Sequence, residues 1–185
     1  MLFPSDTVYG LATAPDSDAG VRRLYALKGR PAARPTAVMF FDLGLALRAL
    51  PELGQRTGEA VGRLLPGPMT LVLPNPARRY PLACGPEPER VGLRVPWLSG
   101  AAAPLAAVRV AVLQSSANRS GAADARSLGE VDERIRCAVD LELDGGELPG
   151  TPSTVVDLTH YEQDGAYTVL REGAASVEAV AAALA

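Results

Sequence analysis

The chain has 185 residues, of which 48% are hydrophobic, and its formal net charge at pH 7 is −3. This length is enough for one sizeable core and short for two independently folding units. The acidic balance argues against indiscriminate nucleic-acid binding driven by counterion release, but it allows a local cleft lined by arginines. The two cysteines, Cys84 and Cys137, lack metal-ligand spacing, and the most apolar stretch is too short to span a bilayer. We therefore expect one cytoplasmic domain with no membrane role.

Short runs rich in β-branched residues alternate with segments of helical period, which predicts an α/β architecture. The first helix is expected at 18–28, with Asp18 as its N-terminal cap and Lys28 at its end, and a buried strand follows at 36–41. Further helices are expected at 43–50, 56–65 and 176–185, and further strands at 69–74, 90–96, 108–116, 153–159 and 166–173. The prolines of 74–89 predict an irregular connection.

Lys28 is the only lysine in a chain that holds eighteen lysine and arginine residues. Arginine replaces lysine freely on a solvated surface, but not where a compact ammonium must approach a phosphate oxygen. Taken alone, one surviving lysine is explained as well by chance as by function. Its neighbours Arg30 and Arg34 favour function, because the three cations together would form a site for a polyanion.

Familiar catalytic signatures are missing from this sequence. It contains no Walker A motif, no G-x-G-x-x-G and no G-x-S-x-G. His160, the only histidine, lies in a polar segment typical of a solvated turn, so a histidine-based triad or metal site is not expected. Instead, several expected strands border on hydroxyl, amide or arginine side chains. These segments are SDTVYG, KGRPAARP, GLRVP, SSANRSG, STVVD and LREG.

Each segment alone has a structural explanation, such as a Ser/Asn turn or a strand that ends before proline. In this order, however, they resemble the motifs of the YrdC-like family, the threonylcarbamoyl-AMP synthases, over residues 3 to about 173. The resemblance implies a single domain over 1–185, with an open twisted mixed sheet, helices packed on it and a concave basic cleft.

The resemblance also implies a nucleotidyltransferase. Members of the family condense L-threonine, bicarbonate and ATP into threonylcarbamoyl-AMP and pyrophosphate, for the t6A modification of tRNA at position 37. Mg²⁺ is expected to accompany ATP without a dedicated protein metal site. A tRNA-modifying transferase complex is the expected partner, with at most a weak contact to tRNA itself.

Individual positions take their expected roles from the family motifs. Lys28 and Arg30 are the expected catalytic residues, since fixed cations stabilise the leaving pyrophosphate without a protein nucleophile or strong base. The expected threonine-binding residues are Thr7, Arg94, Ser116 and Ser153. The expected ATP-binding residues are Lys28, Arg30, Arg34, Asn118 and Arg171.

The sequence also departs from the family pattern. Ser5 stands where threonine is usual, and Met39 stands where some members have a histidine that touches threonine. Arg90 and Arg126 stand where a smaller polar residue is common near the nucleotide. The family carries about twenty further residues before SDTVYG, so a helix and part of the first strand are expected to be missing, and the chain resembles the short form without a C-terminal domain.

Two other functions remain open from the sequence. One is a domain of the same fold that forms a carbamoyladenylate from carbamoyl phosphate. The other is a non-catalytic RNA-binding module, against which the acidic net charge argues.

Overall fold

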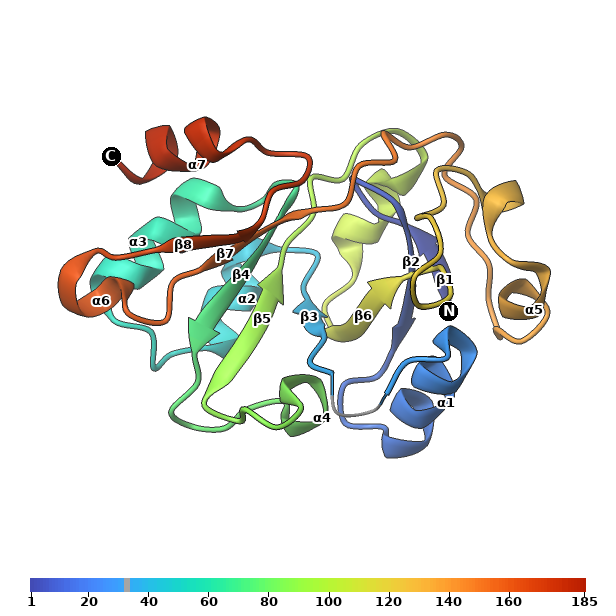
Figure 1. Cartoon of the computed structure of the whole chain (residues 1–185), viewed down its shortest axis with the longest axis horizontal. Helices are drawn as coiled ribbons and strands as arrows, with labels where there is room; N and C mark the ends of the chain where they lie inside the picture. Colours follow the sequence, from blue (N-terminus) through green and yellow to red (C-terminus); the bar gives the residue numbers. More distant parts are fainter. Residues whose placement is uncertain (32–33) are drawn as a thin grey trace.

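The computed structural model describes residues 1–31 and 34–185. Within these ranges eight strands form one open mixed sheet in the order β1-β2-β6-β3-β5-β4-β7-β8, which confirms the predicted fold class (Figure 1). The β3–β5 and β4–β7 pairs are parallel, and the other neighbours are antiparallel. The strands are β1 (Leu2–Pro4), β2 (Tyr9–Thr13), β3 (Ala37–Met39), β4 (Met69–Pro74), β5 (Arg90–Arg94), β6 (Val112–Ser116), β7 (Thr154–Asp157) and β8 (Thr168–Arg171).

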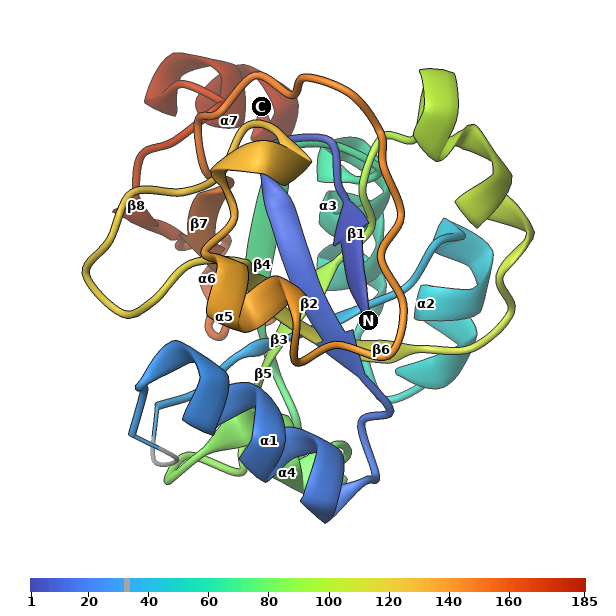
Figure 2. The same cartoon turned by 90° about the vertical axis from the view of Figure 1, so that its right-hand side faces the viewer.

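Helices cover the sheet unevenly. In Figures 1 and 2, α2 and α3 lie on the face of the sheet that is turned away from the viewer of Figure 1, and α3 packs against α6 and α7. None of the helices in the described residues has the length and apolar character needed to span a bilayer. The α-helices are α1 (Asp18–Lys28), α2 (Leu43–Ala49), α3 (Gln55–Leu64), α4 (Pro81–Cys84), α5 (Glu133–Arg136), α6 (Tyr161–Asp164) and α7 (Val177–Leu184). The short 3₁₀ helices are η1 (Gly100–Ala107) and η2 (Leu128–Glu130).

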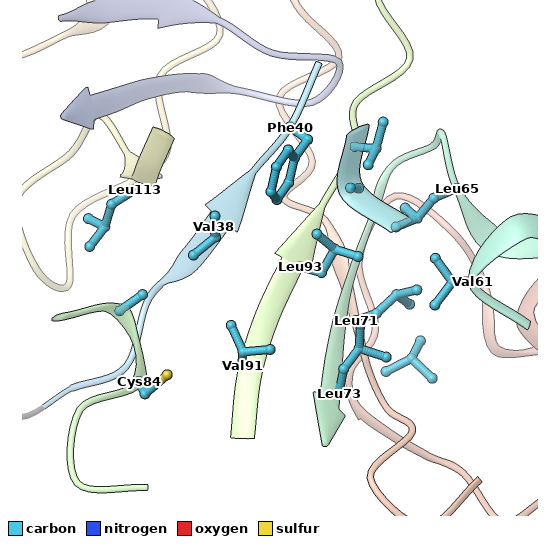
Figure 3. Packing of buried hydrophobic residues seen from close by; sticks show 14 of the residues in the cluster. Val38, Phe40, Val61, Leu65, Leu71, Leu73, Cys84, Val91, Leu93 and Leu113 are labelled. Carbon is cyan, nitrogen blue, oxygen red and sulfur yellow. The ribbon is translucent and has the colours of Figure 1, made fainter. Parts of the chain in front are cut away.

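The two central strands β4 and β5 separate apolar from polar side chains. Leu71, Leu73, Val91 and Leu93 are at most 2% exposed and face the core that also contains Val61 of α3 (Figure 3). Because successive side chains of a strand point to opposite faces, the residues between them lie on the other face of the sheet. These are Thr70, Val72, Arg90, Gly92 and Arg94.

A second, smaller apolar cluster contains Phe3, Ala12, Met39 and Phe41. The rings of Phe3 and Phe41 meet edge to face, with their centroids 6.1 Å apart. Met39 is fully buried in this cluster. The position where some relatives are expected to have a histidine is therefore filled here by an apolar side chain that packs in the core.

Several local expectations were wrong or incomplete. The strands expected at 36–41, 153–159 and 166–173 are shorter than expected, and the connection expected to be irregular at 74–89 contains α4. Ser17, not Asp18, caps α1, because its Oγ accepts the backbone N–H of Gly20 at 3.1 Å. The strand expected at 108–116 begins only at Val112, since η1 comes first and Val110 is 66% exposed, so that this apolar run is not a core strand. Strand β2 was not predicted: its first two residues belong to the motif SDTVYG, and no element was expected at 11–13.

The loop after β8 is held to β7 by one buried hydroxyl. Thr154 Oγ1 accepts the backbone N–H groups of Gly173 at 2.9 Å and Ala175 at 3.0 Å, and it donates to the carbonyl of Ala175. Thr154 itself has no exposed surface.

We expect Thr154→Val to lower the free energy of unfolding by about 3 kcal/mol, because valine keeps the shape but leaves these buried backbone groups unpaired. Chemical denaturation with urea measures this change. Thr168→Val, at an exposed position of β8, serves as the control and should change stability by less than about 0.5 kcal/mol. Equal effects of the two substitutions would contradict this explanation.

Candidate active site

A cavity of about 660 Å³ lies against the polar face of the sheet. Its wall takes residues from β3 to β8, from the end of α1 and from the turn after β6. Among the described residues, six cationic and two acidic side chains line it. The cavity brings together eight of the predicted site residues, namely Lys28, Arg30, Arg34, Arg94, Ser116, Asn118, Ser153 and Arg171. The ninth, Thr7, lies behind the wall and contacts Arg94.

Lys28 is directed into the protein from the last turn of α1. The helix ends at Gly29, whose φ of 57° is the left-handed conformation that glycine adopts readily. The Lys28 ammonium donates to the carbonyl oxygen of Asn118 at 2.8 Å, to its Oδ1 at 3.0 Å and to the carbonyl oxygen of Ser116. Lys28 is only 3% exposed. The side chain therefore fastens the end of α1 to the turn after β6.

These three acceptor oxygens explain why the residue is a lysine. An ammonium presents three donors around one small nitrogen, whereas a guanidinium is planar and spreads its donors over a wider fork. Oxygens that converge on one point therefore suit an ammonium and not a guanidinium. The sequence suggested a charge placed beside a phosphate, but the observed contacts show an ammonium that first holds the protein wall together.

Burial lowers the pKa of Lys28 to about 8, and the nearby positive charge of Arg30 adds to this effect. The carboxylate of Asp124, which also lines the cavity, acts in the opposite direction. Burial thus destabilises the charged form of Lys28, and an anion in the cavity would stabilise it.

Arg30 and Arg34 form the adjoining wall. The guanidinium of Arg30 donates to Ser115 Oγ at 3.2 Å and to the carbonyl of Pro35, and it lies 5.8 Å from the centre of the Tyr25 ring. Burial lowers the pKa of Arg30, and Arg34 lowers it further. Neither arginine has a carboxylate partner within the described ranges of the chain. Their charges are therefore available to an anionic ligand.

The turn after β6 is ordered by its own polar side chains. Ser116 Oγ donates to Asn118 Oδ1 at 2.6 Å, and Asn118 Nδ2 donates to the carbonyl of Ala122 at 2.6 Å. Together with Lys28, these contacts fix the SSAN segment at the cavity wall. Ser115, which the sequence analysis did not single out, joins the site through its bond to Arg30.

Arg94, the last residue of β5, is buried beside the carboxylate of Asp6. Its Nη2 donates to Asp6 Oδ1 at 2.5 Å and to Thr7 Oγ1 at 3.0 Å, and the side chains of Arg94 and Asp6 are only 4% and 6% exposed. Burial raises the pKa of Asp6, while the positive charge of Arg94 opposes this rise. Sequence reasoning missed Asp6 as a site residue, although the acid stands inside the quoted motif SDTVYG.

Ser153 and Arg171 meet at the junction of β7 and β8. Arg171 Nη2 donates to the carbonyl oxygen of Ser153 at 2.7 Å, and the hydroxyls of Ser153 and Thr70 lie 2.9 Å apart. Thr70 was also missed. The sequence contained a signal for Thr70, because it is the only polar side chain inside the apolar run MTLVLP. In the structure it lines the cavity.

The two unusual arginines have different surroundings. Arg90 lines the cavity and forms ion pairs with Asp157 and, at 3.1 Å, with Glu87. Arg126 is not part of the cavity wall and pairs with Glu147 at 2.7 Å. The two departures from the family pattern therefore differ, because only Arg90 adds a cation to the wall.

This arrangement suits anion binding better than covalent catalysis. Burial raises the pKa of the Cys84 thiol at the cavity wall, which disfavours a reactive thiolate. His160 precedes α6 and is not in the wall. The described residues contain no group of three His, Cys, Asp or Glu side chains that could hold a metal ion. Fixed cations at a cavity wall can, however, stabilise negative charge as it develops.

Comparisons with known proteins agree with this geometry. The family model described as Telomere recombination, which covers Sua5, YciO and YrdC, matches residues 1–173. A protein of Pyrococcus abyssi named threonylcarbamoyl-AMP synthase is 31% identical over 96% of this chain, and a protein of the same name from Halorhodospira halophila is 34% identical over 80% of it. The crystal structure of Pyrococcus abyssi Sua5 complexed with L-threonine aligns with a TM-score of 0.80 at 28% identity, over 98% of this chain.

The alignments cover different shares of these relatives. The chain spans about half the length of the Pyrococcus abyssi protein, with 51% of the sequence and 52% of the crystal structure aligned. It spans 78% of the Halorhodospira halophila protein.

Proposed function

Because the chain belongs to the Sua5, YciO and YrdC family, we propose that it is an L-threonylcarbamoyladenylate synthase. It takes L-threonine, bicarbonate and ATP and forms threonylcarbamoyl-AMP and pyrophosphate. Bicarbonate takes up a proton and loses water to give carbon dioxide, and the amine of threonine adds to it and gives up a proton, which forms a carbamate. The carbamate oxygen attacks the α-phosphorus of ATP, and the bond from that phosphorus to the pyrophosphate oxygen breaks. The product serves the t6A modification at position 37 of tRNA.

The observation that carries this proposal is the cavity itself. Lys28, Arg30 and Arg34 form a first group of side chains at the cavity wall, and Arg94 and Ser153 form a second group that lines the same cavity. A polyphosphate needs the first group, and a small amino acid with a carboxylate suits the second. Developing charge on the leaving pyrophosphate is stabilised by cations that are already in place.

Mg²⁺ is proposed to enter with ATP and to be held mainly by its phosphate oxygens. Among the residues that the structure describes, Asp124 and Glu87 supply the carboxylates at the cavity wall, which fits a metal with few protein ligands. When bound, the ion would neutralise part of the charge of the phosphates. A tRNA-modifying transferase complex in the cytoplasm is the proposed recipient of the product.

A pyrophosphate-release assay tests the function. Purified protein with Mg²⁺, ATP, bicarbonate and L-threonine should release pyrophosphate, and omission of threonine should abolish the release. Mass spectrometry of the mixture should detect threonylcarbamoyl-AMP.

Two further reactions separate the alternatives. If carbamoyl phosphate replaces both threonine and bicarbonate as the required substrate, the chain is a carbamoyladenylate-forming domain instead. If no pyrophosphate is released but structured RNA binds with a steep dependence on salt, the chain is an RNA-binding module. Either result would overturn the proposal.

A further inference from the structure

The ion pair between Asp6 and Arg94 holds Arg94 in place from behind the cavity wall. Arg94 lines the cavity, whereas Asp6 does not. Asp6 binds Arg94 through Oδ1, and its Oδ2 accepts the backbone N–H of Trp97 at 3.0 Å. Both oxygens of one buried carboxylate are thus used to fix two points of the segment Arg94–Trp97.

The remaining contacts of this motif reinforce the same support. Ser5 Oγ accepts the backbone N–H groups of Thr7 at 3.2 Å and Val8 at 3.3 Å and donates to the carbonyl of Val8, so the turn that carries Asp6 is closed. Thr7 Oγ1 then accepts a second bond from Arg94 Nη2. The rotation of the guanidinium is therefore restrained by two neighbouring residues of one short turn.

One part of the guanidinium has no protein partner. Arg94 Nε is buried and bonds to no atom of the described residues. A buried N–H without a partner is unfavourable, and a carboxylate that enters the cavity would supply the missing acceptor. Because Asp6 and Thr7 both bind Nη2, the nitrogens of the guanidinium that remain for a ligand, among the contacts of the described residues, are Nε and Nη1.

We propose that Asp6 is a positioning residue, which orients Arg94 for the carboxylate of the amino-acid substrate and acts only through Arg94. This inference rests on the proposed function for the identity of that substrate. It concerns the amino-acid end of the cavity, and it predicts that loss of Asp6 weakens threonine use without weakening ATP use. A general loss of structure would affect both substrates.

The first test is steady-state kinetics of Asp6→Asn. Asparagine keeps the size and one acceptor oxygen but removes the charge, so the guanidinium loses its fixed orientation. We expect KM for threonine to rise at least tenfold while KM for ATP changes less than twofold. Asp6→Glu, which keeps the charge, should recover most of the loss. Asp18→Asn removes an exposed carboxylate that pairs with Arg22, and it serves as the matched control that changes neither KM.

The second test is a double-mutant cycle with Arg94→Gln. If Asp6 acts through Arg94, Asp6→Asn should have no further effect on KM for threonine in the Arg94→Gln background. The double variant buries two neutral amides instead of an unpaired charge, which favours its folding. Additive effects in the cycle, or equal changes in KM for both substrates, would overturn the proposal.

A third measurement keeps the inference separate from the enzymatic assignment. Trp97 is the only tryptophan of the chain, and its backbone is bonded directly to Asp6. Titration with L-threonine in the presence of ATP should change its fluorescence, and Asp6→Asn should raise the midpoint at least tenfold. If the wild-type protein binds threonine but releases no pyrophosphate, only the proposed function fails. If Asp6→Asn leaves the midpoint unchanged, the inference itself fails.

Discussion

Lys28→Arg is expected to reduce kcat/KM for ATP about 100-fold, although it keeps the positive charge. The ammonium of Lys28 fits among three oxygens of the turn after β6 at a position that is only 3% exposed. A guanidinium is larger and planar, so it would displace Asn118 and the wall that this residue forms. Displacements of about 1 Å in a catalytic site are enough for an effect of this size. The measurement is the pyrophosphate-release assay with varied ATP.

The control is an exchange of arginine for lysine at an exposed position. Arg22→Lys changes a side chain that is 69% exposed and forms an ion pair with Asp18, and it should leave kcat/KM unchanged. Chemical denaturation of both variants shows whether the chain remains folded. Full activity of a folded Lys28→Arg protein would show that the charge alone matters and that the converging oxygens do not.

The affinity for ATP is expected to fall as the pH rises from 8 to 9.5, with a slope that approaches tenfold per pH unit above the pKa of Lys28. The pKa of Lys28 is about 8 in the free protein, and bound phosphates raise it because they favour the charged form. Above pH 8 the ammonium must therefore regain a proton before ATP binds. One unit of pKa difference corresponds to a tenfold change in affinity. Calorimetric titration with ATP in the absence of threonine measures this without interference from the threonine amine.

Deprotonation of Lys28 does not weaken ATP binding by unfolding the protein, because the contribution of Lys28 to stability changes with pH in the opposite direction. The pKa of Lys28 in the folded chain lies below its usual value of 10.5, so the unfolded chain binds more protons between about pH 8 and 10.5. The contribution of Lys28 to stability therefore rises with pH in this window. Lys28→Met should bind ATP more weakly but with an affinity that does not depend on pH from 8 to 9.5. A pH-independent wild-type affinity would contradict the prediction.

Much of the fold was predictable, because the alternation of apolar and polar residues along a strand indicates which face of the sheet each side chain occupies. The alternation in MTLVLP and RVGLR assigns Leu71 and Leu93 to the core and Thr70 and Arg94 to the opposite face. The prediction failed at 108–111, where an apolar composition stands on an exposed segment rather than in a strand. Composition says how hydrophobic a segment is, but not whether the tertiary structure has a place for it in the sheet.

The sequence by itself determined the α/β class, because periodicity acts over short stretches of chain, and the order of its motifs gave the family resemblance that implied the sheet and the site residues. It named Lys28 and Arg94 but not what they touch. Their partners Asn118 and Asp6 lie 90 and 88 positions away, and only the strand order of the sheet brings them within hydrogen-bond distance. The tertiary structure therefore decided that the lysine holds a turn in place and that the arginine has an acid behind it, because a contact between distant segments has no local signature.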